Sequence, residues 1–557
     1  MERRVILAIV LMLIVAVLPS ILFPPKKQAV SRVGGLADSS RVARESAAAP
    51  AAAEQPSAYP PIRLSGSAPA ETVWVTSPLY RLGFSTRGGA LVRVELSNYR
   101  SFAPGDSGAA VQLVPEGLPL LVSARISGSD TTAFSAWSLT PSAPRLRVGQ
   151  DTVALTLTGQ RGGARVTLAY RFFPGEYVFE VRGRLEGFGS SGSTLLVGLG
   201  EGIRSVEADS IDDFRHYAVV TKAAKTQSTA FQSLQPGERK ILDGPFEWAG
   251  VKSKYFFVAA LAVAENRPQF GGGIGVGGER TITASSLFGK SSVATRTALA
   301  LTLPVPPAGD FRYDVYAGPL EYRRLAHLGH DLDDANPYGG FLRPIIQPVS
   351  VLVVNILIWM HDRLSLAYGW VLIIFGVLIR ALLWPLNQKA MESSIRMQAV
   401  APLIKQVQDR YKNEPERLQR EMMRLYKEHN VNPLGGCLPM LLPLPVLFAL
   451  FFVFANTIEF RGVPFLWLPD LSRPDPYYII PVVMGLSMFA LSKLGQIGVP
   501  PNPQAKTMLY FMPAFMTLLF LRFASGLNLY YAVQNIVSLP QQYMIALRRM
   551  REQGKRT

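Results

Sequence analysis

The chain has 557 residues, of which 48% are hydrophobic and only 17% are charged. This balance is typical of a membrane protein that also carries a folded soluble part. The net charge of +17 would suit nucleic acid or anionic lipid. Because the sequence contains no helix-turn-helix, zinc or aromatic-basic RNA motif, lipid and basic cytoplasmic loops explain the charge better. The single cysteine, Cys437, excludes an internal disulfide, and with only five histidines the chain is not expected to hold a metal.

An apolar run near the amino terminus, residues 5–23, follows Arg3 and Arg4. A cleaved signal peptide would look similar, but nineteen apolar-rich residues are long for a signal core, and no small-x-small cleavage site follows them. We therefore predict that residues 1–23 form a transmembrane anchor. Residues 24–70 are rich in Ala, Ser and Pro and have too little apolar content to fold, so they are predicted to be a flexible linker.

Residues 71–319 change to a period of two, which is typical of β-strands. Residues 92–96 and 152–158 alternate apolar with polar side chains. Residues 164–185 form two such runs around Pro174-Gly175-Glu176, which predicts a hairpin. Roughly 250 residues of short strands favour one large antiparallel sandwich over several small domains. The region shows no nucleophile elbow, phosphate loop or paired acids, so binding or spacing is a better interpretation than catalysis.

Residues 341–364 mix apolar spacing with several charged or titratable side chains, and we predict an amphipathic helix lying at the membrane surface. The region that follows, residues 365–547, contains five apolar runs that suggest bilayer crossings. These runs span residues 367–386, 434–457, 477–491, 508–521 and 527–547. Together with the first anchor they predict six transmembrane helices, and the last two are joined by a tight turn at residues 522–526.

The charges in the loops predict the orientation in the membrane. Residues 388–432 carry nine Lys or Arg and six acids, residues 493–506 carry two Lys and no acid, and the basic tail at 548–557 carries five Lys or Arg against one Glu. Residues 458–476, by contrast, carry two Arg and three acids. The positive-inside rule places the first three segments and both termini in the cytoplasm. The β region then lies on the other side of the membrane.

Apolar residues within 388–432 recur at spacings of three and four, as on one face of a helix. They are Met397, Val400, Ile404, Val407 and Tyr411, followed by Leu418, Met422 and Leu425. Pro415 suits the first turn of a second helix, whereas Pro402 should bend or loosen the first. The pattern predicts a cytoplasmic helical hairpin. It is either a solvated connector or a docking arm for ribosomes, targeting factors or emerging chains.

Arg380 places a charge inside the apolar run at 367–386. A charge at that depth costs about 2.5–3.5 kcal/mol on insertion-derived scales, and none of the later apolar runs contains an Asp or Glu that could pair with it. Two interpretations stay open. The side chain reaches the cytoplasmic interface just beyond Pro385, or it lines a hydrated recess that receives polar cargo.

Polar and methionine side chains in the last two runs are candidates for the lining of the same recess. The polar ones are Tyr530, Tyr531, Gln534 and Asn535, for which ordinary hydrogen bonding between helices is the alternative. Met508, Met512 and Met516 recur every four residues. Methionine suits a sliding surface that accommodates many apolar partners, although helix packing explains the stripe equally well.

Several blocks of this sequence resemble the YidC membrane-protein insertase family in its Gram-negative form. They are VLIRALLWPL (377–386), the hairpin segment ending in NPLGGCLPML (397–441), DPYYIIPVVMG (475–485) and SGLNLYYAVQNIVSLPQQ (525–542). Upstream, YRLGFSTRGGALVRVELSNY (80–99) and YAGPLEY (316–322) are similar to the periplasmic domain of that form. The likeness runs from about residue 72 nearly to the end of the chain.

The resemblance implies a polytopic α-helical membrane protein with six transmembrane helices, a large all-β supersandwich-like periplasmic domain and a cytoplasmic helical hairpin. It implies a groove open to the cytoplasm and to lipid, with the family's groove arginine at Arg380 and its tyrosine pair at Tyr530 and Tyr531. Four residues before the arginine the family often has a polar Thr. This chain has Gly376, so the resemblance leaves the polarity of the groove open at that position.

The resemblance further implies a non-enzymatic insertase of the bacterial inner membrane, which guides hydrophobic segments of nascent proteins from the cytoplasm into the bilayer, alone or with the Sec translocon. The implied partners are nascent membrane proteins, membrane lipids, the ribosome and the signal recognition particle receptor. No cofactor and no nucleic-acid site are expected. The residues alone leave two other classes open, a membrane-anchored periplasmic carbohydrate-binding protein and a small-solute transporter, although no inverted repeats or paired broken helices favour the transporter.

Overall fold

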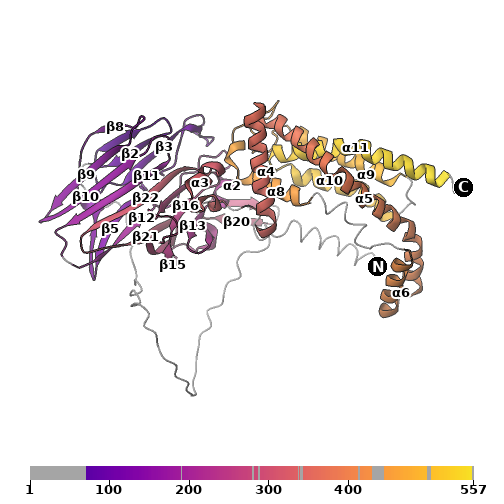
Figure 1. The fold of residues 1–557 in the computed structure, drawn as a ribbon, viewed down its shortest axis with the longest axis horizontal. Coiled ribbons are helices and arrows are strands. Elements are labelled where there is room, and N and C mark those ends of the chain that lie inside the picture. The colour runs from indigo at the N-terminus through magenta and orange to yellow at the C-terminus, as the bar shows by residue number, and fades with distance from the viewer. Residues whose placement is uncertain are drawn as a thin grey trace, which may run out of the picture. The chain divides into compact units, whose positions relative to one another are not determined.

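The computed structural model describes residues 70–189, 191–278, 282–286, 289–336, 338, 343–411, 414–429, 444–497 and 503–554. The chain divides into two compact units, with the boundary between Ala335 and Asn336. The first unit is rich in strands and the second is helical (Figure 1). The predicted anchor, nearly all of the predicted linker, Cys437 and the end of the basic tail lie outside the described residues.

The first unit, here the β domain, contains three large sheets in which nearly all neighbouring strands are antiparallel. The five-stranded sheet runs β4 (Ala110–Gln112), β3 (Leu91–Arg100), β2 (Tyr80–Ser85), β1 (Thr72–Thr76), β8 (Arg145–Arg147). The nine-stranded sheet runs β14 (Thr226–Ala230), β13 (Ala218–Lys222), β16 (Trp248–Lys252), β17 (Phe256–Leu261), β22 (Asp310–Pro319), β11 (Val178–Glu186), β10 (Ala164–Phe172), β9 (Val153–Arg161), β7 (Thr140–Pro141).

The remaining strands form a six-stranded sheet and a separate pair. The six-stranded sheet runs β15 (Arg239–Phe246), β18 (Phe270–Gly277), β21 (Thr297–Val305), β12 (Ser193–Gly198), β5 (Val122–Ser127), β6 (Asp130–Ala133), and the pair is β19 (Ile282–Ser286) with β20 (Gly289–Val293). Short helices α2 (Ser210–Arg215) and α3 (Tyr322–Leu328) complete the unit with the 3-10 turns η2 (Phe134–Ala136), η3 (Phe231–Ser233) and η4 (Leu332–Ala335).

The predicted hairpin at residues 164–185 is confirmed. Strands β10 and β11 pair antiparallel, with Phe172 opposite Phe179, and the turn between them contains Gly175 at φ 73°. Only glycine adopts that backbone angle without steric cost. The apolar residues that alternate along β10 are the buried ones, because every second side chain of this strand faces the interior.

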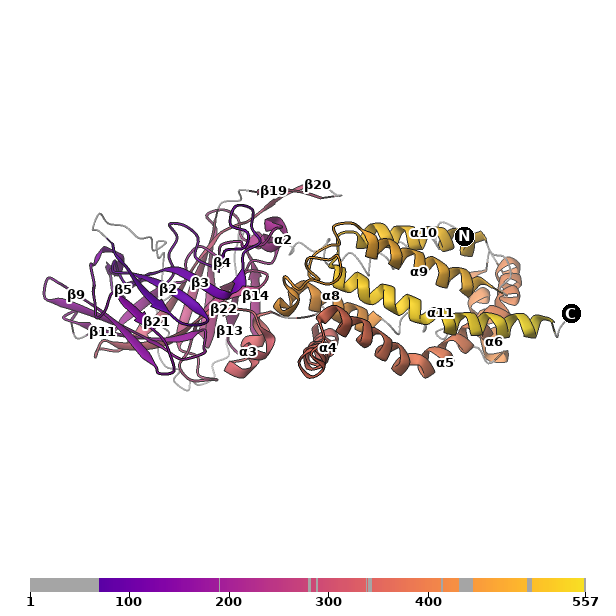
Figure 2. The same cartoon turned by 90° about the horizontal axis from the view of Figure 1, so that it is seen from above.

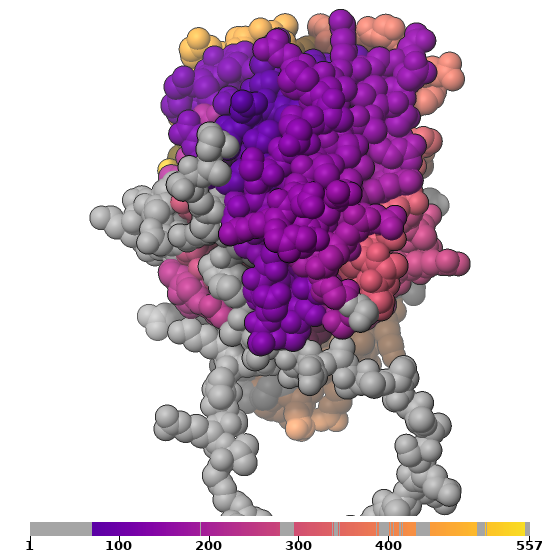
Figure 3. Space-filling model, turned by 90° about the vertical axis from the view of Figure 1, so that its left-hand side faces the viewer, coloured from indigo at the N-terminus to yellow at the C-terminus, as the bar shows by residue number. Residues whose placement is uncertain are grey.

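The interior of the β domain is an aromatic layer between sheets. Phe84 of the five-stranded sheet lies 4.5 Å from the ring of Tyr170 and 6.0 Å from the ring of Phe179, both in the nine-stranded sheet. The Tyr170 hydroxyl donates to the carbonyl of Gly89 at 2.7 Å, so its one polar atom is satisfied in the core. The sheets therefore pack face to face as a β-sandwich, and Figure 3 shows the continuous outer surface of its indigo-to-purple strands.

The second unit, here the helical unit, consists of α4 (Arg343–Leu364), α5 (Tyr368–Arg410), α6 (Pro415–Glu428), α8 (Leu444–Asn456), α9 (Ile479–Gln496), α10 (Pro503–Phe520) and α11 (Ser525–Gly554), with the 3-10 turn η7 (Ile458–Phe460). Helices α9, α10 and α11 run alongside one another, while α4 crosses their direction (Figures 1 and 2). Helix α11 packs against α9 and α5, and α4 packs against α8.

Helix α5 differs from the prediction, since it is continuous for 43 residues. It includes the predicted crossing at 367–386 and also the first arm of the hairpin predicted at 388–432. The helix passes without a break through Pro385 and through Pro402, the residue that we expected to bend or loosen it. A proline removes one helical hydrogen bond and crowds the preceding turn, but the flanking bonds can hold the helix together. Pro415 does begin α6, as predicted.

Two segments of the described residues are long and apolar enough to cross a bilayer, Tyr368–Pro385 and Ile479–Gln496. They coincide with two of the six predicted crossings. The apolar parts of α8 and α10, Val446–Asn456 and Leu509–Phe520, are shorter. Helix α11 has 30 residues but carries several amide side chains, which lower its mean hydropathy. The six-helix arrangement therefore stays a prediction.

Candidate functional site

The seam between α5 and α11 contains four of the six residues predicted to line the groove. Gln534 donates its side-chain Nε2 to the backbone carbonyl of Gly376 at 2.7 Å. Tyr530 is buried, and its ring lies 6.1 Å from that of Phe375. Because residues 530 and 534 are one helical turn apart, both project toward α5.

Gly376 is explained by close packing between the two helices. A Cβ atom added at this position would lie 3.1 Å from Cγ1 of Val533 and 3.6 Å from Cδ2 of Tyr530. A small residue at a helix contact allows the backbones to approach each other closely. At this contact the Gly376 carbonyl accepts the hydrogen bond from Gln534. The seam is thus polar at position 376 through its backbone.

Arg380 is half-buried in the same seam, and its partner is neutral. Its Nη2 donates to Oε1 of Gln541 at 2.8 Å. Gln541 is only 4% exposed. Within the described part of the chain, Nε of Arg380 and Nε2 of Gln541 are buried without a hydrogen-bond partner, and no carboxylate there bonds to the guanidinium. An amide satisfies one donor, and among the described residues no opposite charge compensates the guanidinium.

The Arg380 side chain extends toward the carboxyl ends of α5 and α11. Gly376 and Arg380 are four residues apart, about 6 Å along the helix, whereas their partners Gln534 and Gln541 are seven residues apart, about 10.5 Å. The guanidinium therefore reaches about one further turn along α11. In the predicted orientation this direction is toward the cytoplasm, as the snorkelling interpretation expects. The side chain nevertheless remains held between two helices.

Tyr531 and Asn535 lie on another face of α11. Asn535 donates to Oγ of Ser487 in α9 at 3.2 Å, and the ring of Tyr531 lies 5.6 Å from that of Phe520 at the end of α10. Consecutive residues of a helix point about 100° apart, so Tyr530 and Tyr531 cannot face the same neighbour. The structure therefore brings Gly376, Arg380, Tyr530 and Gln534 together and directs the other two predicted residues toward α9 and α10.

The methionine stripe lies on α10, where Met512 and Met516 are half-buried. The side chain of Met508 lies outside the described residues. Half-buried thioethers leave part of their surface free for a partner, and they also pack against neighbouring helices. Both interpretations of the stripe stay open.

The predicted apolar stripe of the hairpin lies between α5 and α6. Val400 is buried, and six members of the stripe are half-buried: Ile404, Val407, Tyr411, Leu418, Met422 and Leu425. The side chain of Met397 lies outside the described residues. The two helices contact each other, and the burial of this stripe is consistent with its packing between them.

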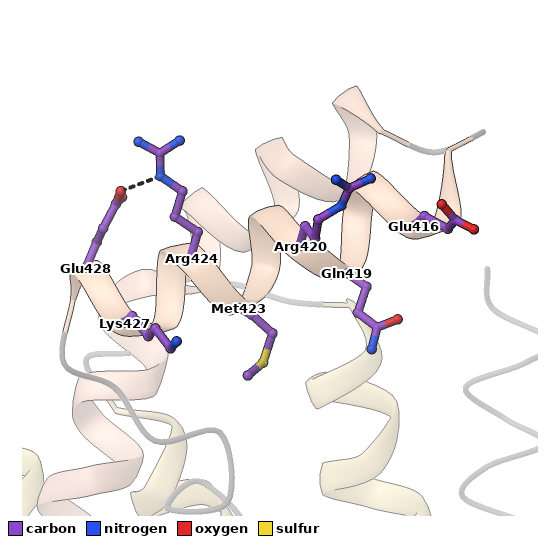
Figure 4. Close-up of a pocket in the computed structure, with 7 residues that line it drawn as sticks. All are labelled: Glu416, Gln419, Arg420, Met423, Arg424, Lys427 and Glu428. Carbon is purple, nitrogen blue, oxygen red and sulfur yellow. Dashed lines mark hydrogen bonds and ion pairs between the residues drawn. The ribbon is translucent and has the colours of Figure 1, made fainter.

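The opposite face of α6 contains an open hollow that the periodicity did not reveal (Figure 4). It is lined by Glu416, Gln419, Arg420, Met423, Arg424, Lys427 and Glu428. Met423 is 50% exposed between these charged side chains, and Arg424 pairs with Glu428 at 2.7 Å. An exposed apolar side chain among cations is a better candidate for partner contact than the stripe itself.

Gln541 is the site residue that sequence reasoning missed. It lies seven residues after Gln534, which is two turns along the same face of α11. That spacing is the signal that could have identified it, because a buried arginine can donate to an amide as well as to an acid.

The β domain holds its buried charges differently. Glu180 of β11 is 1% exposed and pairs with Arg171 and Arg182 at 3.0 Å and with Arg312. Asp213 of α2 is also 1% exposed and accepts from the Ser205 hydroxyl at 2.7 Å. Burial raises the pKa of the Asp213 carboxyl to about 7, although the Ser205 hydrogen bond opposes the shift.

Known protein families match both the β domain and the helical unit. The model of the YidC periplasmic domain matches residues 72–352, and that of the 60Kd inner membrane protein matches residues 359–553. The two matches define an inner-membrane protein with a large periplasmic β-sandwich domain and a helical carboxyl-terminal region. The sequence is 32% identical over 501 residues to the membrane protein insertase YidC of Syntrophus aciditrophicus, covering 88% of each chain.

A second relative, the membrane protein insertase YidC of Aromatoleum aromaticum, is also 32% identical, over 83% of this chain and 82% of its own. The chain belongs to the YidC membrane protein insertase family, and the predicted resemblance is confirmed. Among solved structures, the active YidC insertase with its first transmembrane domain resolved is 18% identical, with a TM-score of 0.34 over 87% of this chain and 94% of that one.

Proposed function

We propose that this protein is an insertase that guides hydrophobic segments of nascent proteins from the cytoplasm into the inner membrane, and that the α5–α11 seam around Arg380 receives the polar flank of each segment. The observation that carries the proposal is the neutral partner of Arg380, the side-chain amide of Gln541 at 2.8 Å. A structural ion pair would have an acid there. An uncompensated guanidinium retains its attraction for an incoming carboxylate.

The chemistry of the seam suits a transient polar guest. Arg380 Nε and Gln541 Nε2 are buried donors without partners in the described residues, and such donors gain free energy when water or a guest acceptor reaches them. A client carboxylate that displaces Gln541 would accept two parallel N–H bonds from the guanidinium. The polar flank would thereby avoid several kcal/mol of exposure to hydrocarbon.

Release follows from the apolar part of the client. Each Å² of apolar surface removed from water contributes about 25 cal/mol, so a full crossing outweighs a few hydrogen bonds in the seam. The half-buried Met512 and Met516 of α10 are the proposed sliding surface. Partition into lipid would supply the driving force without a nucleotide.

We assign the delivery of the nascent segment to the hairpin of α5 and α6. The open hollow around Met423 on α6 is the proposed docking surface. The proposed topology has six crossings, both termini in the cytoplasm, the β domain in the periplasm and α4 along the membrane surface. The crosswise direction of α4 in Figure 1 supports this last assignment. Nascent membrane proteins and lipids are the proposed partners, with the Sec translocon, the ribosome and the signal recognition particle receptor as further candidates.

The test compares charge with geometry at position 380. We expect Arg380→Ala to reduce insertion of small single- and double-spanning clients at least tenfold, and Arg380→Lys to retain most of it, because a lysine keeps the charge. The measurement is the fraction of radiolabelled client protected in proteoliposomes. Arg549→Ala is the matched control, since Arg549 is a buried arginine of α11 that donates to the Gly495 carbonyl at 2.7 Å.

Equal loss in both Arg380 variants would assign geometry rather than charge to this residue. Normal insertion in both would remove it from the mechanism. A second readout is independent of clients: in a Cys437→Ser background, a cysteine at position 380 should react with a membrane-impermeant thiol reagent. A cysteine sealed from that reagent would contradict a hydrated recess.

A further inference from the structure

The segment between α8 and α9, here the α8–α9 loop, is folded around a buried carboxylate. Asp475 is fully buried. It accepts from the backbone N–H groups of Tyr477 at 3.0 Å and Ile480 at 2.8 Å, and from the indole Nε1 of Trp467 at 3.2 Å. Two donors at the beginning of α9 and one from Trp467, earlier in the loop, converge on one side chain, so the loop has a defined shape.

The loop also fixes the starts of the helices around it. The ring of Phe465 occupies the space beside Gly369, where an added Cβ would lie 2.1 Å from it. Asp475 caps the first turn of α9 through Ile480, and the carbonyl of Arg473 accepts from Ser525 N at the start of α11 at 2.7 Å. The two segments long enough to cross a bilayer begin at Tyr368 and Ile479, so the loop lies at the level where both begin.

The tip of the loop is a two-residue turn that presents apolar side chains. Phe465 and Leu468 exchange backbone hydrogen bonds of 2.9 and 2.8 Å, which leaves Leu466 and Trp467 at the tip. Leu466 is 68% exposed, Trp467 is 39% exposed, and Leu466 has a φ of 53°. Bulky side chains rarely adopt that backbone angle. Strain and apolar exposure at one residue point to a role for its position.

Other exposed aromatic residues lie at the same level. Trp370 is at the beginning of the first span, and Tyr477 and Tyr478 immediately precede the second; each is at least half exposed. Tryptophan and tyrosine concentrate where membrane spans enter the headgroup region. Residues 462–469, which include the tip, carry no charge.

We propose that the α8–α9 loop is a lipid anchor, in which Leu466 and Trp467 insert into the bilayer at the boundary between headgroups and acyl chains. The tip packs against the start of α5 through Phe465, which lies beside Gly369 and 5.5 Å from the ring of Trp370, so the depth of the tip would set the depth of α5. Arg380 lies eleven residues after Gly369, about 16 Å along that helix. The anchor therefore sets how far below this interface the guanidinium lies. In the proposed topology the leaflet concerned is the periplasmic one.

The test measures the depth of the tip directly. Full-length protein with Cys437→Ser carries a single nitroxide at Leu466→Cys in liposomes of phosphatidylethanolamine and phosphatidylglycerol. We expect relaxation of the label by dissolved oxygen to exceed relaxation by a water-soluble nickel chelate at least threefold. The matched control is Arg473→Cys, an exposed position of the same loop, where we expect the nickel chelate to be the more effective reagent.

Equal access of the nickel chelate at both positions would overturn the proposal, since the tip would then be in water. Protection of position 466 from both reagents would also overturn it, because a protein surface rather than lipid would cover the tip. The readout needs no client, so it can fail while insertion is normal, and insertion can fail while the tip remains in lipid.

Discussion

The β domain and the helical unit treat buried charge in opposite ways. In the β domain, the buried carboxylate of Glu180 is surrounded by three arginines. In the helical unit, Arg380 donates to an amide and Arg549 donates to a backbone carbonyl, so neither cation has an opposite charge in those contacts. A compensated charge stabilises one structure, whereas an uncompensated charge retains affinity for a guest. This difference is the basis for our proposal that the helical unit, rather than the β domain, receives the client.

The largest expected effect comes from supplying the missing acid. Gln541→Glu would place a carboxylate against the Arg380 guanidinium, where Gln541 now accepts at 2.8 Å. The internal ion pair would compete with client carboxylates, and we expect insertion in proteoliposomes to fall at least tenfold. Gln542→Glu is the control, since Gln542 faces Gly495 of α9 and should leave insertion within twofold of wild type. Insertion at the wild-type level by Gln541→Glu would contradict the proposal that the free charge of Arg380 attracts client carboxylates.

The converse change removes a compensating charge from the β domain. Glu180→Ala leaves Arg171, Arg182 and Arg312 without their shared acid. We expect the free energy of unfolding to fall by about 2–3 kcal/mol, less than for a fully buried pair because the arginines are partly exposed. Chemical denaturation of the full-length protein in detergent, followed by circular dichroism of the sheets, measures it. Glu186→Ala removes the acid of two ion pairs, with Arg165 and Arg184, whose members are all more than two-fifths exposed, and should cost less than about 1 kcal/mol.

A smaller effect concerns pH. Because burial raises the pKa of Asp213 to about 7 from an ordinary value of 3.8, the folded β domain binds this proton more tightly than the unfolded chain does. Its contribution to stability is therefore largest below pH 4 and is lost as the pH rises toward 7. We expect Asp213→Asn to be more stable than wild type at pH 8, by on the order of 2 kcal/mol, with a smaller difference at pH 5.

The same denaturation measured at both pH values tests this expectation, with Asp151→Asn, an exposed aspartate, as the control for net charge. Parallel pH profiles for wild type and Asp213→Asn would show that the buried carboxyl does not take up a proton in this range.

The smallest expected effect is at the helix contact. Gly376→Ala adds a Cβ at 3.1 Å from Val533, which a small shift of one side chain can relieve. We expect the free energy of unfolding to change by less than about 1 kcal/mol and insertion to change by less than twofold. Gly485→Ala, whose Cβ would lie 1.9 Å from the Thr517 hydroxyl, should be clearly worse. Equal effects would mean that the α5–α11 seam is packed as tightly as α9 on α10.

Local periodicity predicted much of the fold. The β10–β11 hairpin, the start of α6 at Pro415 and the turn before Ser525 follow from alternation, proline placement and short loop length. The continuity of α5 did not follow, because a proline lowers local helix propensity while the rest of the hydrogen-bond ladder maintains the helix. Tyr530 and Tyr531 were both predicted to line the groove, although consecutive residues of a helix point about 100° apart. Gln541 was overlooked because an arginine's partner was expected to be charged.

The unbroken course of α5 has a mechanical consequence. Measured along the helix axis, its 43 residues extend about 64 Å, roughly twice the thickness of the hydrocarbon layer. Arg380 and Arg410 are about 45 Å apart along that axis. Tilting its free end by a few degrees would displace the guanidinium relative to Gln541 on the separate helix α11. In the proposed topology, a partner that binds the hairpin end of α5 would in this way weaken the hydrogen bond between Arg380 and Gln541.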